Sequence, residues 1–178
     1  MVMLILVVVS ILGVGSAQIA LMSERSARND RDMQVAWQSA EAALMDAQLD
    51  MLGTRASTFD GSNDSYATSG CGTSGNALGF CTQNLTGKPA WLTVDFTNTG
   101  ASAKTIEFGH FTSRPFVATG TGIQPAKAPR YIIELIQDNC PTCDTPPQKF
   151  IYRVTAMGFG PRPDIQAVLQ ALYRPHPT

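Results

Sequence analysis

The chain has 178 residues, 15% of them charged, and a formal net charge of −1. A chain of this length accommodates one ordinary domain once a membrane segment is set aside. The arginines Arg25, Arg28 and Arg31 alternate with acidic residues, so no polybasic tract supports nucleic-acid binding.

Residues 1–22 form an apolar run without charge or proline. A helix of this length spans roughly 33 Å, enough to cross a hydrocarbon core of about 30 Å. No loop signal follows the run, so we expect one rod of roughly 78 Å that continues to residue 52. A secretory signal peptide is the alternative, because Gly15 and Ala17 are spaced like a cleavage site. Against it, no positive residue precedes the run, and the sequence after Ala17 stays helical.

Residues 23–53 become amphipathic. Apolar residues recur at spacings of three and four, which predicts one helical stripe that packs on a core: Met33, Trp37, Ala40, Leu44, Ala47 and Met51. Glu41 lies off the stripe and is expected on the surface. Gly53 follows the last stripe residue, where a left-handed helix cap is expected.

Residues 54–89 are rich in Gly, Ser, Thr and Asn, which predicts a long loop without an element of its own. Cys71 and Cys81 lie within it, and Cys140 and Cys143 form a CPTC turn. Four cysteines favour an oxidising compartment and two local disulfides, each worth roughly 2–3 kcal/mol. Three pairings are compatible with the sequence, and a thioredoxin-like redox turn or a four-thiolate zinc site are further alternatives.

Residues 90–178 are expected to form the sheet. Leu92, Val94 and Phe96 alternate as in a strand, and a weaker alternation follows at Ile106 and Phe108. Residues 130–137, 150–157 and 164–173 are clearer strands, and no helical pattern separates them, so hairpins would pair them antiparallel. The helical stripe is the only cover of suitable length for their apolar face. We therefore predict an α+β fold, in which a long N-terminal helix packs on a C-terminal antiparallel sheet.

This arrangement resembles a type IV pilin. The segment RNDRDMQVAWQSAEAALMDAQ, residues 28–48, is similar to the N-terminal signature of PilX-type minor pilins. The ending YRVTAMGFGPRPDIQAVLQALYR, residues 152–174, resembles that family's closing strands. In this register Met1 corresponds to the mature first residue, without the family's basic leader, and Ile5 replaces the usual glutamate that attracts a neighbour's N-terminal amine.

The resemblance implies a structural, non-enzymatic subunit without cofactor or metal, which primes pilus assembly, counters retraction in twitching motility and presents a PilY-type tip adhesin for cell adhesion. Its partners would be other major and minor pilins, with the inner membrane as its site before assembly, a periplasmic head, and the fibre tip as its final place. Assembly contacts would involve Met1, Ile5 and Glu41, and the loss of the glutamate at Ile5 suits a subunit with no neighbour above it. No nucleic acid is expected as a partner.

Other readings stay open. A type II secretion pseudopilin is close in sequence, and a DNA-uptake pilin or a membrane-anchored redox or metal protein using Cys140 and Cys143 are further classes. No catalytic constellation is evident, because His110 and His176 are isolated in the sequence. The oxygen-rich residues 60–64 lack the pattern of a calcium loop.

Overall fold

A computed structural model describes residues 1–59, 70–116, 122–137 and 150–174. Cys140, Cys143, His176 and the oxygen-rich residues 60–64 lie outside the described residues.

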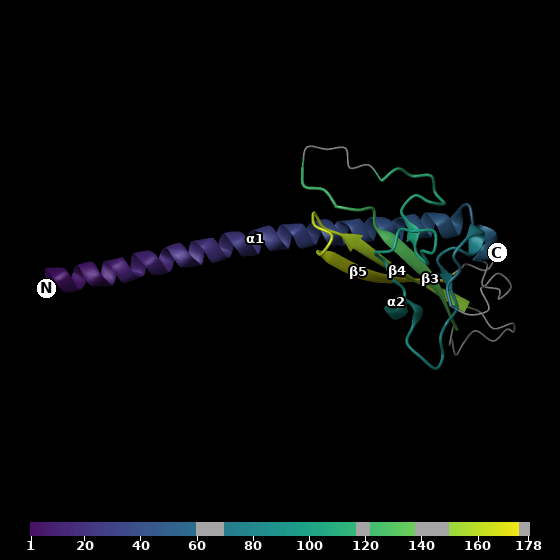
Figure 1. The fold of residues 1–178 in the computed structure, drawn as a ribbon, viewed down its shortest axis with the longest axis horizontal. Coiled ribbons are helices and arrows are strands. Elements are labelled where there is room, and N and C mark those ends of the chain that lie inside the picture. Colours follow the sequence, from purple (N-terminus) through teal and green to yellow (C-terminus); the bar gives the residue numbers. More distant parts are fainter. Residues whose placement is uncertain (60–69, 117–121, 138–149, 175–178) are drawn as a thin grey trace.

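One helix, α1 (Val2–Leu52), runs without interruption for 51 residues. It extends as a rod from a head that packs against only its C-terminal part (Figure 1). The predicted continuity of the apolar and amphipathic halves is therefore confirmed. The predicted left-handed cap is wrong, because Gly53 has a φ of −109°. The chain instead turns sharply, and the N–H groups of Gly53 and Arg55 both donate to the Asp50 carbonyl.

The head is a five-stranded sheet built on β3 (Arg130–Gln137), β4 (Phe150–Phe159) and β5 (Gln166–Tyr173). These strands pair antiparallel in that order, from Arg130 opposite Met157 to Phe159 opposite Gln166. On the other edge of β3 lie β2 (Ile106–Glu107), which is antiparallel to it, and β1 (Phe80–Cys81), which is parallel. The predicted α+β fold and its antiparallel core are confirmed, with one parallel pair added.

Two sequence predictions about the middle of the chain are wrong. Residues 54–89 do contain elements, namely β1 and the short 3-10 turns η1 (Ala56–Thr58) and η2 (Gly75–Ala77). The strand expected around residues 92–96 is replaced by the short helix α2 (Ala90–Thr93). The reason is tertiary, since buried Glu134 accepts the N–H of Ala90 at 2.8 Å and holds the chain where it turns after Pro89.

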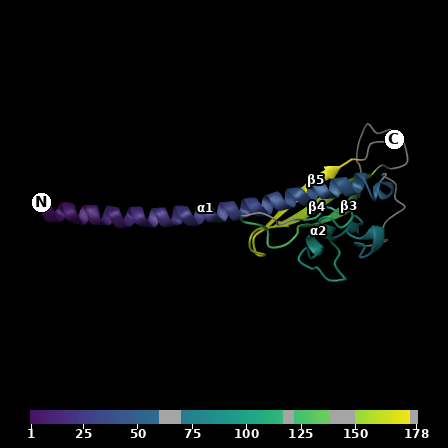
Figure 2. The ribbon, with the colours of Figure 1, turned by 90° about the horizontal axis from the view of Figure 1, so that it is seen from above.

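Small residues let α1 approach the sheet closely. Four fully buried alanines form its contact face: Ala36, Ala40, Ala43 and Ala47. A Cβ on Gly158 of β4 would lie 2.2 Å from the Ala36 carbonyl oxygen, so backbone meets backbone at this point. Beneath the alanines lies a core that includes Tyr131, Ile133, Tyr152, Val154 and Ala156. The opposite side of the sheet is covered by α2 (Figure 2), where Ile132 packs in a cluster with Ala90 and Phe96.

The predicted packing stripe needs correction at its N-terminal end. Ala40, Ala47 and Met51 are buried and Leu44 is partly buried, but Met33 is 42% exposed and Trp37 is 50% exposed. The buried face is centred on the alanines, about 60° around the helix from the predicted stripe. At this end α1 lies over β5 and the residue before it, where Ala36 clusters with Ala167 and Ile165. No further strand among the described residues covers the flank that carries Trp37.

Candidate functional site

The first candidate surface is the apolar half of α1, residues 1–22. Its large apolar side chains are all exposed, including Met1 and Ile5, and the helix is long and apolar enough to cross a membrane. The hydroxyls of Ser10 and Ser16 donate to helix carbonyls one turn earlier, each at 2.8 Å. These two hydroxyls are thus satisfied within the helix, as a lipid environment requires.

The exposed residue Glu41 belongs to the head-bearing half of α1. Its carboxylate accepts the indole N–H of Trp37 at 2.9 Å. Farther along the same half, on the side opposite the alanines, Met45, Leu49 and Leu52 are also exposed. The outward side of α1 therefore carries apolar side chains well beyond residue 22.

A buried ionic cluster joins the end of α1 to the sheet and to the loop before β1. The guanidinium of Arg55 donates to both carboxylate oxygens of Asp50, one of them at 2.8 Å, and to the carbonyls of Asn76 and Leu78 at 2.9 and 3.0 Å. Asp50 also accepts the hydroxyl of Tyr131 at 2.9 Å. Burial, and then the nearby charge of Asp50, raise the pKa of the Tyr131 phenol. Tyr131 thus remains a neutral hydrogen-bond donor, and the cluster connects the end of α1 to β3.

Asp46, one turn earlier in α1, likewise connects the helix to the head, here to the loop that follows β2. It is fully buried and accepts the N–H of Gly109 at 2.8 Å and the hydroxyl of Thr112 at 2.5 Å, with Arg114 at 3.7 Å. Gly109 has a φ of +81°, which favours glycine. The loop after β2 is therefore bound to the helix by a charged acceptor.

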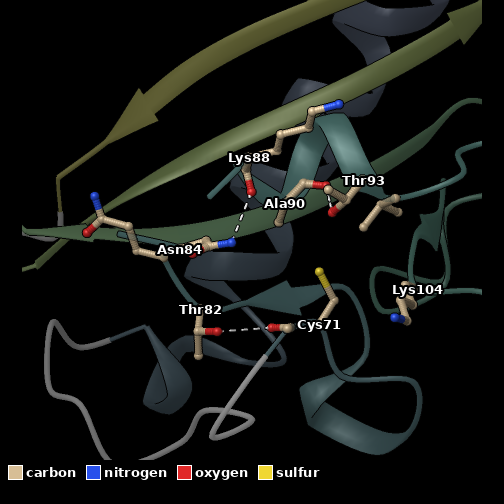
Figure 3. A pocket seen from close by; sticks show the side chains of 10 residues that line it. Cys71, Thr82, Asn84, Lys88, Ala90, Thr93 and Lys104 are labelled. Carbon is tan, nitrogen blue, oxygen red and sulfur yellow. Dashed lines mark hydrogen bonds between the residues drawn. The ribbon is translucent and has the colours of Figure 1, made fainter. Parts of the chain in front are cut away.

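Cys71 and Cys81 form a disulfide, which confirms one of the local bridges. This bond uses two of the four cysteine sulfurs and so excludes the four-thiolate zinc site. Beside the bridge lies a partly open pocket with a mixed polar and apolar lining, which includes Thr82, Asn84 and Lys104 (Figure 3). The Thr82 hydroxyl and the Asn84 amide both donate to backbone carbonyls. The lining residues include no acid–base pair, and they do not define a reaction.

An exposed apolar half-helix, continuous with a helix buried on an antiparallel sheet, is the architecture of a type IV pilin subunit. Two family models match: PilX N-terminal over residues 1–44, and Type IV pilus assembly protein PilX C-term over residues 77–175. The chain belongs to the PilX family of type IV pilus assembly proteins, as its sequence suggested, and is a structural minor pilin. No curated protein and no solved structure matches the chain.

Proposed function

We propose that this minor pilin is held in the inner membrane by residues 1–22, with its head in the periplasm, and then enters the fibre and primes its assembly. The single observation that carries the proposal is the apolar half of α1, which no described part of the chain covers. Such a surface requires either lipid or other apolar helices around it.

The same surface explains how the subunit can leave the membrane. Apolar side chains lose about 25 cal/mol of stabilisation for each Å² returned to water, so extraction into water would be strongly unfavourable. Transfer from lipid into a bundle of like helices keeps that surface dry. The net free-energy change of extraction then depends mainly on helix packing rather than on burial.

A tip position, with presentation of a PilY-type adhesin, is the second part of the proposal. It is supported by the absence of any carboxylate in residues 1–22, which leaves this segment without an acidic partner for the amine of a neighbouring subunit. Replacement of Ile5 by Glu would supply that partner in a low-dielectric surrounding, where charge pairs interact strongly. Gold-labelled antibody against the chain should mark fibre ends in the wild type and additional shaft positions in Ile5→Glu. Equal labelling along the shaft in both would contradict the tip position.

Membrane anchoring and fibre entry can be tested with a matched pair of substitutions. Ile11→Arg places a charge near the middle of the apolar half, where insertion costs about 2.5–3.5 kcal/mol. Leu85→Arg places the same charge on a head residue that is 77% exposed. In a strain lacking the native chain, we expect Ile11→Arg to be depleted from membranes and from sheared fibres and to reduce piliation, while Leu85→Arg behaves as wild type. Normal fibre entry of Ile11→Arg would overturn the proposal.

A further inference from the structure

Strand β5 is a sheet edge without the usual protection against pairing. β4 pairs with one side of it, and no strand of the described residues pairs with the other (Figure 1). Natural edge strands are usually short, or carry charges, proline or a bulge that discourage further pairing. β5 has eight residues, QAVLQALY, with no charge, proline or glycine, and its register with β4 is regular throughout.

Exposed apolar side chains lie on both sides of this edge. On the sheet face away from α1, Val168 is 46% exposed and Leu172 is 67% exposed. On the face that carries α1, the exposed apolar side chains are Met33 and Trp37 of the helix. Helix geometry places Trp37 beside β5. It lies about two and a half turns before Asp46 and hence on the opposite flank of α1. Asp46 contacts the loop after β2, so the opposite flank lies towards β5.

These features match the requirements of an added strand. A strand about 4.8 Å beyond β5 would use the outward N–H and C=O groups of β5, and its side chains would alternate between the two faces. One set would cover Trp37 and Met33, and the other would extend the apolar surface of Val168 and Leu172. The indole N–H of Trp37 already donates to the Glu41 carboxylate. Covering the ring therefore leaves no polar group without a hydrogen-bond partner.

We propose that the free edge of β5 binds an extended, uncharged segment of another polypeptide as a sixth strand, beyond the five described. The segment would present apolar residues at alternate positions, at least towards α1. It would carry no charge, because β5 offers no opposite charge and a buried unpaired one is costly. This mode of recognition draws its affinity from the backbone ladder and its selectivity from the alternate side chains.

A second copy of this chain fits the edge poorly. Antiparallel pairing of two β5 strands places a two-fold axis perpendicular to the sheet. Because α1 lies along the sheet (Figure 2), that axis would point the two apolar half-helices in opposite directions. Two such subunits could not share one membrane or one fibre polarity. This step rests on the proposed function and disfavours antiparallel self-pairing; the occupant that we propose is a segment of a different protein.

The test uses the full chain in detergent micelles. Trp91 is replaced by Phe, so that all tryptophan fluorescence comes from Trp37. The probe is a capped eight-residue peptide of alternating Val and Thr, compared with the same peptide N-methylated at every backbone amide, which has no N–H group left to donate from either edge. We expect the unmethylated peptide to slow hydrogen exchange of alternate β5 amides at least tenfold and to shift Trp37 emission to the blue. No slowing, equal slowing by the methylated peptide, or edge amides already protected in the chain alone would each overturn the proposal.

Substitution tests the edge itself. Val168→Lys with Leu172→Lys adds the charges that natural edges carry, and both side chains are exposed, so the fold should be retained. The matched control is Leu85→Lys with Leu92→Lys, two exposed leucines outside β5. We expect peptide affinity to fall at least tenfold in the edge variant only, and unchanged affinity would overturn the proposal.

Sedimentation of the chain without peptide distinguishes the occupants. We expect a monomer in both the wild type and the edge variant. A wild-type dimer that the edge variant abolishes would overturn the proposal in favour of a second copy. Failure of the proposed function is seen separately, as normal fibre entry of Ile11→Arg, and does not alter the peptide measurements.

Discussion

Replacement of Arg55 by Met tests whether the buried ionic cluster holds the head on α1. The Arg55 guanidinium is fully buried and makes four hydrogen bonds with the described residues, two to Asp50 and two to backbone carbonyls. It also stacks on the ring of Phe111, with its central carbon 3.8 Å from the ring centroid. Met fills much of the same volume but makes none of these hydrogen bonds.

The expected loss of stability is about 3–5 kcal/mol, the usual cost of removing one partner of a buried ion pair. Asp50 would keep the Tyr131 hydroxyl as a hydrogen-bond donor, which prevents complete isolation of the carboxylate. The two released carbonyls would add about 1–3 kcal/mol each if water could not reach them. Since a typical domain has only about 5–15 kcal/mol in total, the head should be partly unfolded at physiological temperature.

Urea unfolding of the full chain in detergent, followed by tryptophan fluorescence, measures this loss. Arg162→Met is the control, because Arg162 forms an exposed ion pair with Asp164 and its removal should cost only tenths of a kcal/mol. Adding Asp50→Leu to Arg55→Met should restore part of the loss, since no unpaired charge then remains buried. A cost below about 1 kcal/mol for Arg55→Met would refute the reasoning.

Three further outcomes follow from the structure. Because burial raises the pKa of Tyr131, the phenol ionises above about pH 10 in the unfolded chain but not in the folded chain. Between pH 9 and pH 11 the wild type should therefore lose about 1.4 kcal/mol more unfolding free energy in total than Tyr131→Phe, measured by urea unfolding. The Cys71→Ala, Cys81→Ala variant should lose roughly 2–3 kcal/mol of unfolding free energy, and a loss near zero would contradict the loop-entropy account. Gly158→Ala should destabilise by about 1–3 kcal/mol or more, because its Cβ would lie 2.2 Å from an α1 carbonyl oxygen, whereas the thermal midpoint of Gly122→Ala, with no atom within 4 Å, should stay near wild type.

The parts of the fold that were predicted are those encoded in local side-chain periodicity. The continuous helix and the strands β3, β4 and β5 were predicted within a few residues, because their apolar residues recur at periods of 3.6 and 2 over long segments. The short strand β1 has only two residues and depends on β3 for its hydrogen bonds, so no period within it could be read.

The contact face of α1 could not be read from apolar residues alone. Asp46 and Asp50 are charged, and their burial depends on partners that the chain supplies much later, Gly109 and Tyr131 among them. A usable signal did exist, since both aspartates lie on the same side of the helix as Ala43 and Ala47. Bulky Met33 and Trp37 drew the predicted stripe away from that side.

Because α1 is unbroken between its apolar half and the head, it also fixes the rotational orientation of the head about the helix axis. Each residue inserted into residues 23–31, which are all exposed, would turn the head by about 100° and move it about 1.5 Å along the axis. A single insertion would therefore aim β5 and the disulfide-bridged loop at a different neighbour, although every local contact within the head stayed intact. The spacing of that plain, solvent-facing stretch is thus as much a part of the subunit's interface as any side chain that touches a partner.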